Sequence, residues 1–316
     1  MTYRQGEIIV ASDFNTFRTD VLNIWDVGNG DRGYGQIDTG GAPAIPLAVI
    51  GTDVGSAEWE AFRSAAQTCS DHQGSTTTFP PTPALAVDAD IIAHEADDGN
   101  AYDIDGSLAT IDTNRLVADA GSVSAITNTL VSTRNTSWNT ALQHRFTALL
   151  PTVDDARYFF NSGGQIHFRG SRSGGAGTGQ NASWTEILTN MGTVYMDSTT
   201  TSNFGGAAGW TFASIGYFDL TTSFQEIATG VDTTGGSYAT NEARIDARTV
   251  DGPGGANGDT GRNLEFRIRY RDIHTNPWGD TVNGTIDSRI DYQIATSPLT
   301  IQTPIFASSI VLTDGS

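Results

Sequence analysis

The chain has 316 residues, 38% of them hydrophobic, which is enough for two modest domains or for one β-rich body with an accessory region. It carries 36 acidic and 17 basic residues, a net charge of −19, and a single cysteine, Cys69. A lone cysteine excludes an intrachain disulfide and a thiolate metal cluster, and the acidic balance disfavours nucleic acid as a partner, because phosphate backbones are bound by cationic side chains.

The type of charge is as informative as the total. All 17 basic residues are Arg, and the acids are 28 Asp and 8 Glu. High salt screens the repulsion between the acidic side chains of such a surface, so we expect the protein to come from a salt-adapted organism or its virus. The alternative is an acidic composition that arose without adaptation to salt. The N-terminal sequence MTYRQGEIIV does not have the pattern of a secretory signal, and no apolar run approaches the ~20 residues that span a bilayer. Neither secretion nor membrane insertion is therefore expected.

Two N-terminal stretches have the spacing of amphipathic helices, 12–28 and 56–74. Their apolar stripes are Phe14, Phe17, Val21, Ile24 and Trp25 in the first, and Trp59, Phe62, Ala66 and Cys69 in the second. The pattern acid–aromatic–two residues–Phe–Arg at 13–18 recurs at 58–63, which indicates a short duplicated unit. We expect Ser12 to cap the first helix, and Gly28 and Gly74 to end the two helices. The helices either pack together or dock on neighbouring subunits.

A proline-rich linker and an acidic segment follow. Pro80, Pro81 and Pro83 favour extended backbone, and the range 88–112 is rich in Asp. Hard oxygen ligands suited to Ca²⁺ or Mg²⁺ occur at Asp97, Asp98, Asn100, Asp103 and Asp105. Their spacing does not match an EF-hand, so a solvated acidic loop is favoured over a cation site.

From about residue 128 the hydrophobic period becomes two, interrupted by one short helix at 183–192. The candidate strands are 128–134, 157–161, 165–170, 193–196, 212–220, 224–231, 241–250, 264–273, 284–295 and 299–306. The sequence therefore predicts a mainly β protein, with an antiparallel β-sandwich or jelly-roll-like body and a small N-terminal region of two duplicated helices. The predicted domains are a helical attachment region at 1–76, a linker and acidic segment at 77–125, and the β body at 126–316.

The stretch DARYFFNSGGQIHF, at 155–168, places aromatic residues beside a glycine-containing turn. The alternation of Tyr158 and Phe160 with Phe159 favours a hairpin whose turn is 161–164, because glycine adopts positive φ without strain. In that hairpin Ile166 and Phe168 are buried and His167 faces outward. We expect a structural role for this histidine.

Arginines cluster in the late strands, at Arg244, Arg248, Arg267, Arg269, Arg271 and Arg289. The favoured interpretation is pairing within the sheet to Asp246, Asp287 and Asp291. The alternative is a contact surface for an acidic neighbouring subunit or for an anionic glycan.

Catalytic and cofactor motifs are weak. The loop GSRSGGAGTGQN, at 170–181, lacks the Gly-Lys-Ser/Thr ending of a phosphate-binding loop, and the sequence contains no G-x-S-x-G elbow. The histidines are scattered, at His72, His94, His144, His167 and His274. We therefore expect no catalytic, cofactor-binding or metal-binding residues. A glycan-binding surface would use exposed loop aromatics such as Trp210, Trp278 and Tyr238.

Several stretches resemble virion structural proteins of tailed phages. They are the two helices ending in GYGQ and DHQG, then ARYFFNSGGQIHF, SWTEILTNMGTVYM, GYFDLTTSFQEI, YATNEARIDAR and DTVNGTIDSRIDYQ. The resemblance covers most of the chain but not 77–112, and its motifs are turn and strand signatures. It implies a non-enzymatic tail, baseplate or fibre component without cofactors, assembled in the host cytoplasm as a homo-oligomer that docks through its N-terminal region. The missing lysine departs from that pattern and suggests a haloarchaeal virus. The competing hypotheses are a receptor- or glycan-binding module, a head decoration or turret protein, and a carbohydrate-degrading enzyme.

Overall fold

The structure, a computed structural model, describes residues 10–26, 33–36, 42–51, 54–75, 104–252, 261–274 and 281–312. The chain forms two compact units. Unit 1 comprises Met1–Ser124, Asn161–Gly163 and Ala295–Ile301, and unit 2 comprises Ala125–Phe160, Gly164–Ile294 and Gln302–Ser316.

The described part of unit 1 contains three α-helices, α1 (Ala11–Trp25), α2 (Ser56–Gln73) and α3 (Ile104–Thr113). The duplicated aromatic residues pack against each other: the Phe14 ring lies 5.4 Å from that of Trp59 and 6.1 Å from that of Phe62. The two predicted helices thus pack together within one chain, and their aromatic residues form a buried core that also includes Cys69. Cys69 is buried, as a cysteine that packs as a small hydrophobic residue should be, and burial raises the pKa of its thiol.

The helix ends agree only in part with the sequence. Gly74 ends α2 with a φ of 64°, the left-handed conformation that glycine adopts readily. The prediction for Ser12 is wrong, because α1 begins at Ala11 after Val10, and the Ser12 hydroxyl donates to Asp13 instead. Gly28 lies outside the described residues.

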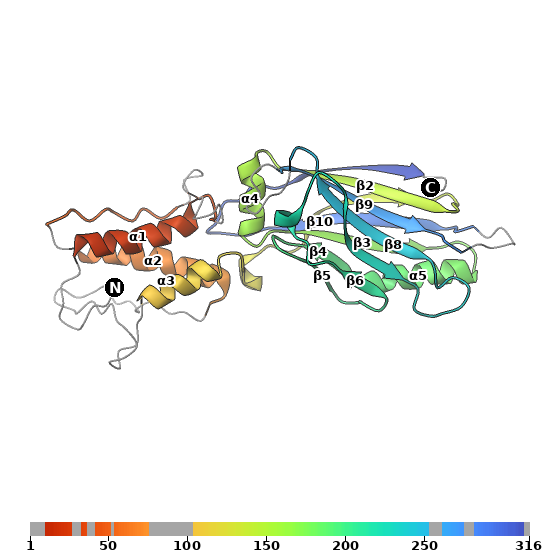
Figure 1. The fold of residues 1–316 in the computed structure, drawn as a ribbon, viewed down its shortest axis with the longest axis horizontal. Helices are drawn as coiled ribbons and strands as arrows, with labels where there is room; N and C mark the ends of the chain where they lie inside the picture. The colour runs from red at the N-terminus through yellow and green to blue at the C-terminus, as the bar shows by residue number, and fades with distance from the viewer. Residues whose placement is uncertain are drawn as a thin grey trace. The chain divides into compact units, whose positions relative to one another are not determined.

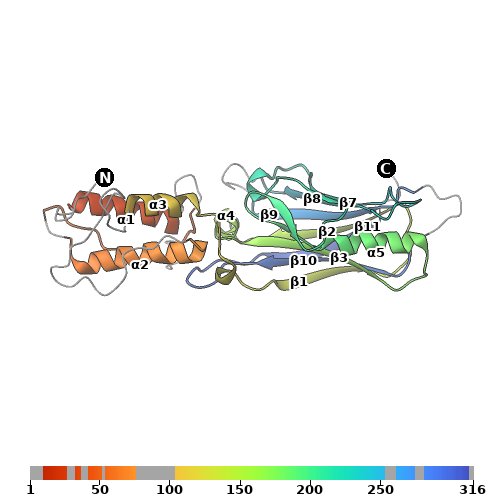
Figure 2. The same cartoon turned by 90° about the horizontal axis from the view of Figure 1, so that it is seen from below.

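Unit 2 contains two antiparallel sheets that pack together, as Figures 1 and 2 show. The five-stranded sheet has the order β1-β10-β3-β4-β5 and the six-stranded sheet the order β11-β2-β9-β8-β7-β6. The strands are β1 (Thr127–Arg134), β2 (Ala141–Leu149), β3 (Gln165–Ser173), β4 (Thr193–Met196), β5 (Thr201–Phe204), β6 (Trp210–Phe212), β7 (Gln225–Val231), β8 (Glu242–Thr249), β9 (Asn263–Arg271), β10 (Thr285–Gln293) and β11 (Ile305–Leu312). The predicted fold class, mainly β with helices at the N-terminus, is confirmed.

The strand order resembles a jelly roll at both ends of the chain and a meander in the middle. β1 pairs with β10 in the five-stranded sheet, and β2 pairs with β9 in the six-stranded sheet. The two chain segments β1–β2 and β9–β10 therefore remain paired partners as both pass from one sheet to the other. β3 then lies on the other side of β10. The strands from β6 to β9 instead follow one another as neighbours in one sheet.

Apolar residues of the two inner faces fill the space between the sheets. Phe168 of β3 lies 4.9 Å, ring to ring, from Phe266 of β9, and both are fully buried. The helix α5 (Gly179–Met191) packs against β3 of one sheet and against β7 and β8 of the other. Its Trp184 contacts Tyr270 with the ring centroids 5.7 Å apart. The predicted helix at 183–192 is therefore present and closes one side of the sandwich.

The predicted hairpin at 155–168 is wrong in its first half. Residues Val153–Asn161 form a helix, α4, and only the second half, β3, is a strand. Thr152 and Asp155 cap the helix reciprocally, because the Thr152 amide donates to the Asp155 carboxylate at 3.0 Å and the Asp155 amide donates to the Thr152 hydroxyl at 3.0 Å. Ala156, Phe159 and Phe160 are fully buried at helical spacing, so tertiary burial decides for the helix.

Further strands differ from the predicted ranges. β5 has no predicted counterpart, and of the strand expected at 212–220 only Phe212 lies in a strand, β6, whereas Tyr217–Asp219 form a 3-10 helix. β2 has no predicted counterpart, although its inner residues Leu142, Phe146 and Ala148 alternate with polar ones. Its fourth inner residue, His144, is polar, and this obscures the alternation. The strand expected at 299–306 begins instead at Ile305, because 295–301 belongs to unit 1.

The interior histidines are uncharged at neutral pH. His144 lies between the sheets with its ring 5.8 Å from that of Tyr270, and burial lowers its pKa to about 4 despite the nearby Asp287. His167 was expected to face solvent, but it is fully buried beside Tyr195 and Phe204. Burial lowers its pKa to about 4 as well, against the attraction of Asp291.

We expect unit 2 to lose stability in mild acid because of these two residues. A histidine with a pKa of about 4 when folded and 6.5 when unfolded stabilises the fold fully above pH 6.5, and this contribution is lost as the pH falls towards 4. The shift corresponds to roughly 3 kcal/mol for each histidine. Denaturant unfolding of the wild type and of His144→Leu, across this pH range at constant salt, checks it. In the variant, the free energy of unfolding should change with pH about half as much as in the wild type. An unchanged pH dependence of the free energy of unfolding would contradict this account.

Candidate functional site

The late arginines lie on the outer face of the six-stranded sheet, where the strand register sets like charges opposite each other. Arg244 of β8 is opposite Arg269 of β9, and Arg267 of β9 is opposite Arg145 of β2. Guanidinium groups directly opposite each other repel, so this register requires a compensating anion.

Asp246 provides that anion. Its carboxylate is fully buried and forms ion pairs with three guanidinium groups: with Arg244 Nε at 2.6 Å, Arg267 Nη2 at 3.0 Å and Arg269 Nε at 2.8 Å. The carboxylate lies below the arginines, which remain partly exposed above it. One buried acid therefore holds three cations in place at the surface.

Glu265 and Phe224 extend the arrangement along the sheet. Glu265 accepts from Arg248 Nε at 2.8 Å and lies 3.9 Å from Arg145 Nη1. The Phe224 ring is stacked with two guanidinium groups, that of Arg248 at 4.3 Å and that of Arg267 at 3.6 Å from its centroid. These contacts limit the rotation of both side chains, and a desolvated cation–π contact is worth up to about 2 kcal/mol.

We call this surface the arginine face. It consists of Arg145, Arg244, Arg248, Arg267, Arg269 and Arg271, with the acids Glu226, Glu242, Asp246 and Glu265. Six cations and four anions leave a local charge of +2 in a chain whose net charge is −19. Arg271 and Arg145 are the most exposed, at 48% and 41% of the side-chain surface. The arrangement presents fixed N–H donors to an anionic group in solution.

The predicted pairing within the sheet is confirmed for Asp246 but not for its two companions. Asp291 pairs with Arg169, and Asp287 accepts a hydrogen bond from the Thr133 hydroxyl at 2.6 Å. Arg289 belongs to β10 of the five-stranded sheet, and it makes no ion pair among the described residues. Five of the six predicted arginines thus come together, and Arg289 does not.

Sequence reasoning missed Arg145 and Phe224 as members of this surface, and it did not name Glu265 as a partner of the arginines. Arg145 lies on the unpredicted strand β2, and Phe224 immediately precedes β7. The strand LEFRIRYR does place Glu265 on the same face as its arginines, so an acid in that row was the available signal.

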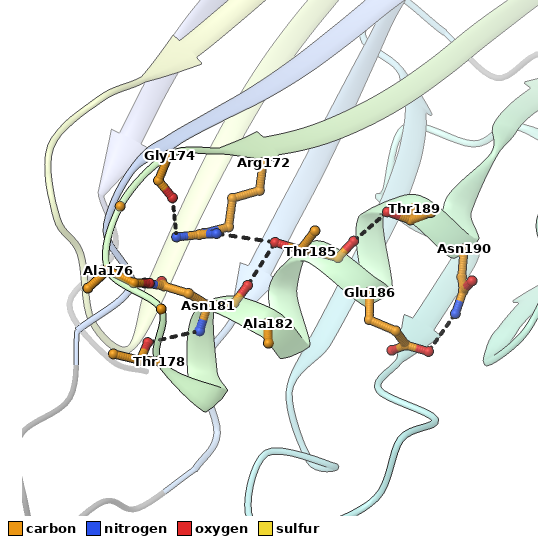
Figure 3. Close-up of a pocket in the computed structure, with 12 residues that line it drawn as sticks. Arg172, Gly174, Ala176, Thr178, Asn181, Ala182, Thr185, Glu186, Thr189 and Asn190 are labelled. Carbon is orange, nitrogen blue, oxygen red and sulfur yellow. Dashed lines mark hydrogen bonds between the residues drawn. The ribbon is translucent and has the colours of Figure 1, made fainter.

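The glycine-rich loop is held by hydrogen bonds within the chain and borders an open groove of about 580 Å³ along α5 (Figure 3). The Ala176 amide donates to Asn283 Oδ1 at 2.6 Å, and the Asn181 amide donates to the Thr178 hydroxyl that caps α5. Arg172 donates to Thr185 Oγ1 at 3.1 Å and to the Gly174 carbonyl at 3.0 Å. The two terminal nitrogens of Arg172 and the amides of Ala176 and Asn181 are therefore engaged by the protein itself.

A smaller pocket of about 240 Å³ in unit 1 is lined by Asp20, Asp105, Asp112 and Asn23 between α1 and α3. Burial raises the pKa of Asp20, and the charges of Asp105 and Asp112 raise it further. The expected acidic loop is wrong at Asp105, which lies in helix α3, and the other candidate ligands, Asp97, Asp98, Asn100 and Asp103, lie outside the described residues. Within the part of the chain that the structure describes, no group of three or more His, Cys, Asp or Glu side chains is arranged to hold a metal ion.

The predicted glycan aromatics are not brought together. Trp210 is buried rather than exposed, and its indole N–H donates to the Ile187 carbonyl at 2.9 Å. Tyr238 packs against His274 at 4.7 Å, and Trp278 lies outside the described residues. Trp210 therefore stabilises the packing of β6 on α5.

The histidines considered as catalytic candidates are on separate elements. His72 ends α2 with its Nε2 3.1 Å from the Ser162 carbonyl, His144 is between the sheets, and His167 is buried on β3. Burial lowers the pKa of His72 as well. His94 lies outside the described residues.

Among the helices that the structure describes, none is long and apolar enough to cross a bilayer. No protein-family model, curated protein or solved structure matches this chain.

We expect Asp246→Asn to destabilise unit 2 by about 2–4 kcal/mol, because it leaves three guanidinium groups around a neutral side chain. The matched control is Glu226→Gln, which removes an exposed carboxylate that pairs with the same Arg244 at 2.7 Å and should cost less than about 1 kcal/mol. Denaturant unfolding of the two variants and the wild type measures both effects. An equal decrease in the free energy of unfolding of the two variants would show that Asp246 does not anchor the arginine face.

Proposed function

We propose that this chain is a non-enzymatic structural component of a tailed-virus particle, associated with its tail, baseplate or fibre. In this proposal the protein assembles as a homo-oligomer in the host cytoplasm and becomes part of the virion. The stretches that resemble tailed-phage virion proteins motivate the assignment, and the Asp-rich, lysine-free composition extends it to the virus of a halophile.

The observation that carries the proposal is the arginine face. A cation-presenting surface on a sheet is complementary to an acidic protein surface, and here the buried Asp246 pairs with three of its arginines. Asp246 and Phe224 hold the guanidinium groups before any partner arrives, which lowers the entropic cost of binding. We therefore assign the arginine face as the contact with an acidic neighbour in the particle.

Unit 1 supplies a second contact surface of different chemistry. Between α1 and α2, the described residues 42–50 approach α1 at Ala48, with which Asn15 exchanges two hydrogen bonds, at 2.9 Å each. The side chains of Leu47, Val49 and Ile50 in this segment are exposed. Exposed apolar residues in a row favour a protein contact, and we propose that this row attaches the N-terminal region to the particle.

Particles purified from the culture that produces this chain should contain it in many copies, at a fixed ratio to the major virion proteins. Quantitative mass spectrometry of particles banded in a density gradient measures that ratio. A chain that is expressed during infection but absent from the banded particles would overturn the proposal.

Arginine footprinting tests the arginine face within the particle. Phenylglyoxal should label Arg145 and Arg271 in the isolated protein, and the labelling should fall at least fivefold in intact particles. Arg262, which is 44% exposed and lies outside the arginine face, is the matched control. Equal labelling of Arg145 and Arg271 in both states would show that the face is free. Protection that appears only after a host polyanionic glycan is added would identify the receptor- or glycan-binding alternative.

A further inference from the structure

The strand β11 is an edge of the six-stranded sheet and differs from the other sheet edges that the structure describes. It runs for eight residues, IFASSIVL, without a charge, a proline or a glycine. β5 and β6, the edges at the far ends of the two sheets, have only four and three residues. β1 ends in Arg134, whose guanidinium donates to the Thr136 carbonyl at 3.1 Å. Short length and charge are the usual protections of an edge against pairing with another chain, and β11 has neither.

The side chains of β11 are exposed on both faces of the sheet. Ile305, on the outer face, is 68% exposed, and Ile310, on the inner face, is 39% exposed. Ala307, Ser308 and Ser309 between them are exposed as well. Phe306 lies 5.9 Å, ring to ring, from Tyr292 of β10, so Phe306, Ser308 and Ile310 face the interior of the sandwich, where β1 of the other sheet lies beside β11.

An edge strand of this kind is completed by another strand, which takes up its backbone N–H and C=O groups. In an antiparallel pair of identical strands, the two-fold axis is perpendicular to the sheet, so each residue is opposite a residue of the same face. An axis at Ser308 sets Ile305 opposite Val311, Phe306 opposite Ile310, and Ala307 opposite Ser309. Large apolar side chains then meet large apolar ones, small meets small, and Ser308 meets its own copy.

The charge of the chain also favours the β11 strand of a second copy as the pairing partner. Two copies of a chain with a net charge of −19 repel each other over most of their surface, and β11 is an eight-residue stretch without any charge. Pairing at this edge places no like charges directly opposite each other. The sequence of β11 is therefore complementary to itself in shape and compatible with itself in charge.

We propose that the β11 strands of two copies pair antiparallel about a two-fold axis at Ser308, joining their six-stranded sheets into one continuous sheet. This inference rests on the self-association that the proposed function assumes, and it defines that contact as isologous. The pairing covers Ile305 and Ile310, which are exposed in the single chain.

The test is the substitution Ser308→Lys, which places two ammonium groups against each other at the axis. The wild type should be a dimer by analytical ultracentrifugation in about 1 M salt, where the Debye length is about 3 Å and the repulsion of net charge is screened. Ser308→Lys should raise the dimer dissociation constant at least tenfold. Ser223→Lys, an equal charge change at an exposed residue before β7, is the matched control and should leave the dimer unchanged. Circular dichroism spectra of the variants check that each of them is folded.

A charge exchange makes the test specific for this register. Ser308→Asp alone should also be monomeric, whereas an equimolar mixture of Ser308→Lys and Ser308→Asp should form a heterodimer, because opposite charges then meet at the axis. A monomeric wild type, a dimeric Ser308→Lys variant, or a mixture that stays monomeric would each overturn the inference. If the variants do not fold, hydrogen exchange of the wild type decides the question, since protection of 305–312 must rise with protein concentration.

These outcomes are separate from those of the proposed function. A monomeric protein that is nevertheless abundant in particles refutes the β11 pairing and leaves the virion assignment standing. A dimer with this register that is missing from particles refutes only the virion assignment.

Discussion

The alternation of side chains along β8 and β9 is the constraint on which unit 2 and its arginine face depend. Ile245 and Phe266 must face the other sheet, because they fill the space between the two layers. This requirement fixes the register, and the register in turn sets Arg244 against Arg269 on the outer face. The sandwich can keep this register because Asp246 is buried among the guanidinium groups. Core packing and surface electrostatics are therefore coupled through a single carboxylate.

Charge is distributed unevenly along the chain. Residues 1–124 carry 19 acidic residues and 5 arginines, a net charge of −14, whereas residues 125–316 carry 17 acidic residues and 12 arginines, a net charge of −5. The β body thus holds most of the cations, and half of its arginines lie on one sheet face. Arginine suits this position better than lysine, because its planar group pairs with Glu265 through two nitrogens and stacks on Phe224. β11, at the edge of the same sheet, has no charge at all.

Sequence periodicity predicted elements well where one principle dominated. The aromatic stripes of 12–28 and 56–74 define helices because only a period near 3.6 aligns them, and the alternation of LEFRIRYR defines a strand for the same kind of reason. It failed where two patterns competed. YFFN has strong β propensity, but the capping pair Thr152 and Asp155 and the buried face of α4 outweigh it. In β2, His144 at an inner position masked the alternation, and Arg145 was missed with it.

The sequence by itself determined the mainly β class, the duplicated helix unit, the acidic composition and the collection of arginines on one face of the late strands. These follow from composition and from the period of apolar residues, which are local properties. Only the tertiary structure decided that the two duplicated helices pack on each other, that Asp246 rather than Asp287 or Asp291 anchors the arginines, and that Trp210 and His167 are buried. Those outcomes depend on which distant strands become neighbours and in what register, and a one-residue change of register would move every side chain to the opposite face.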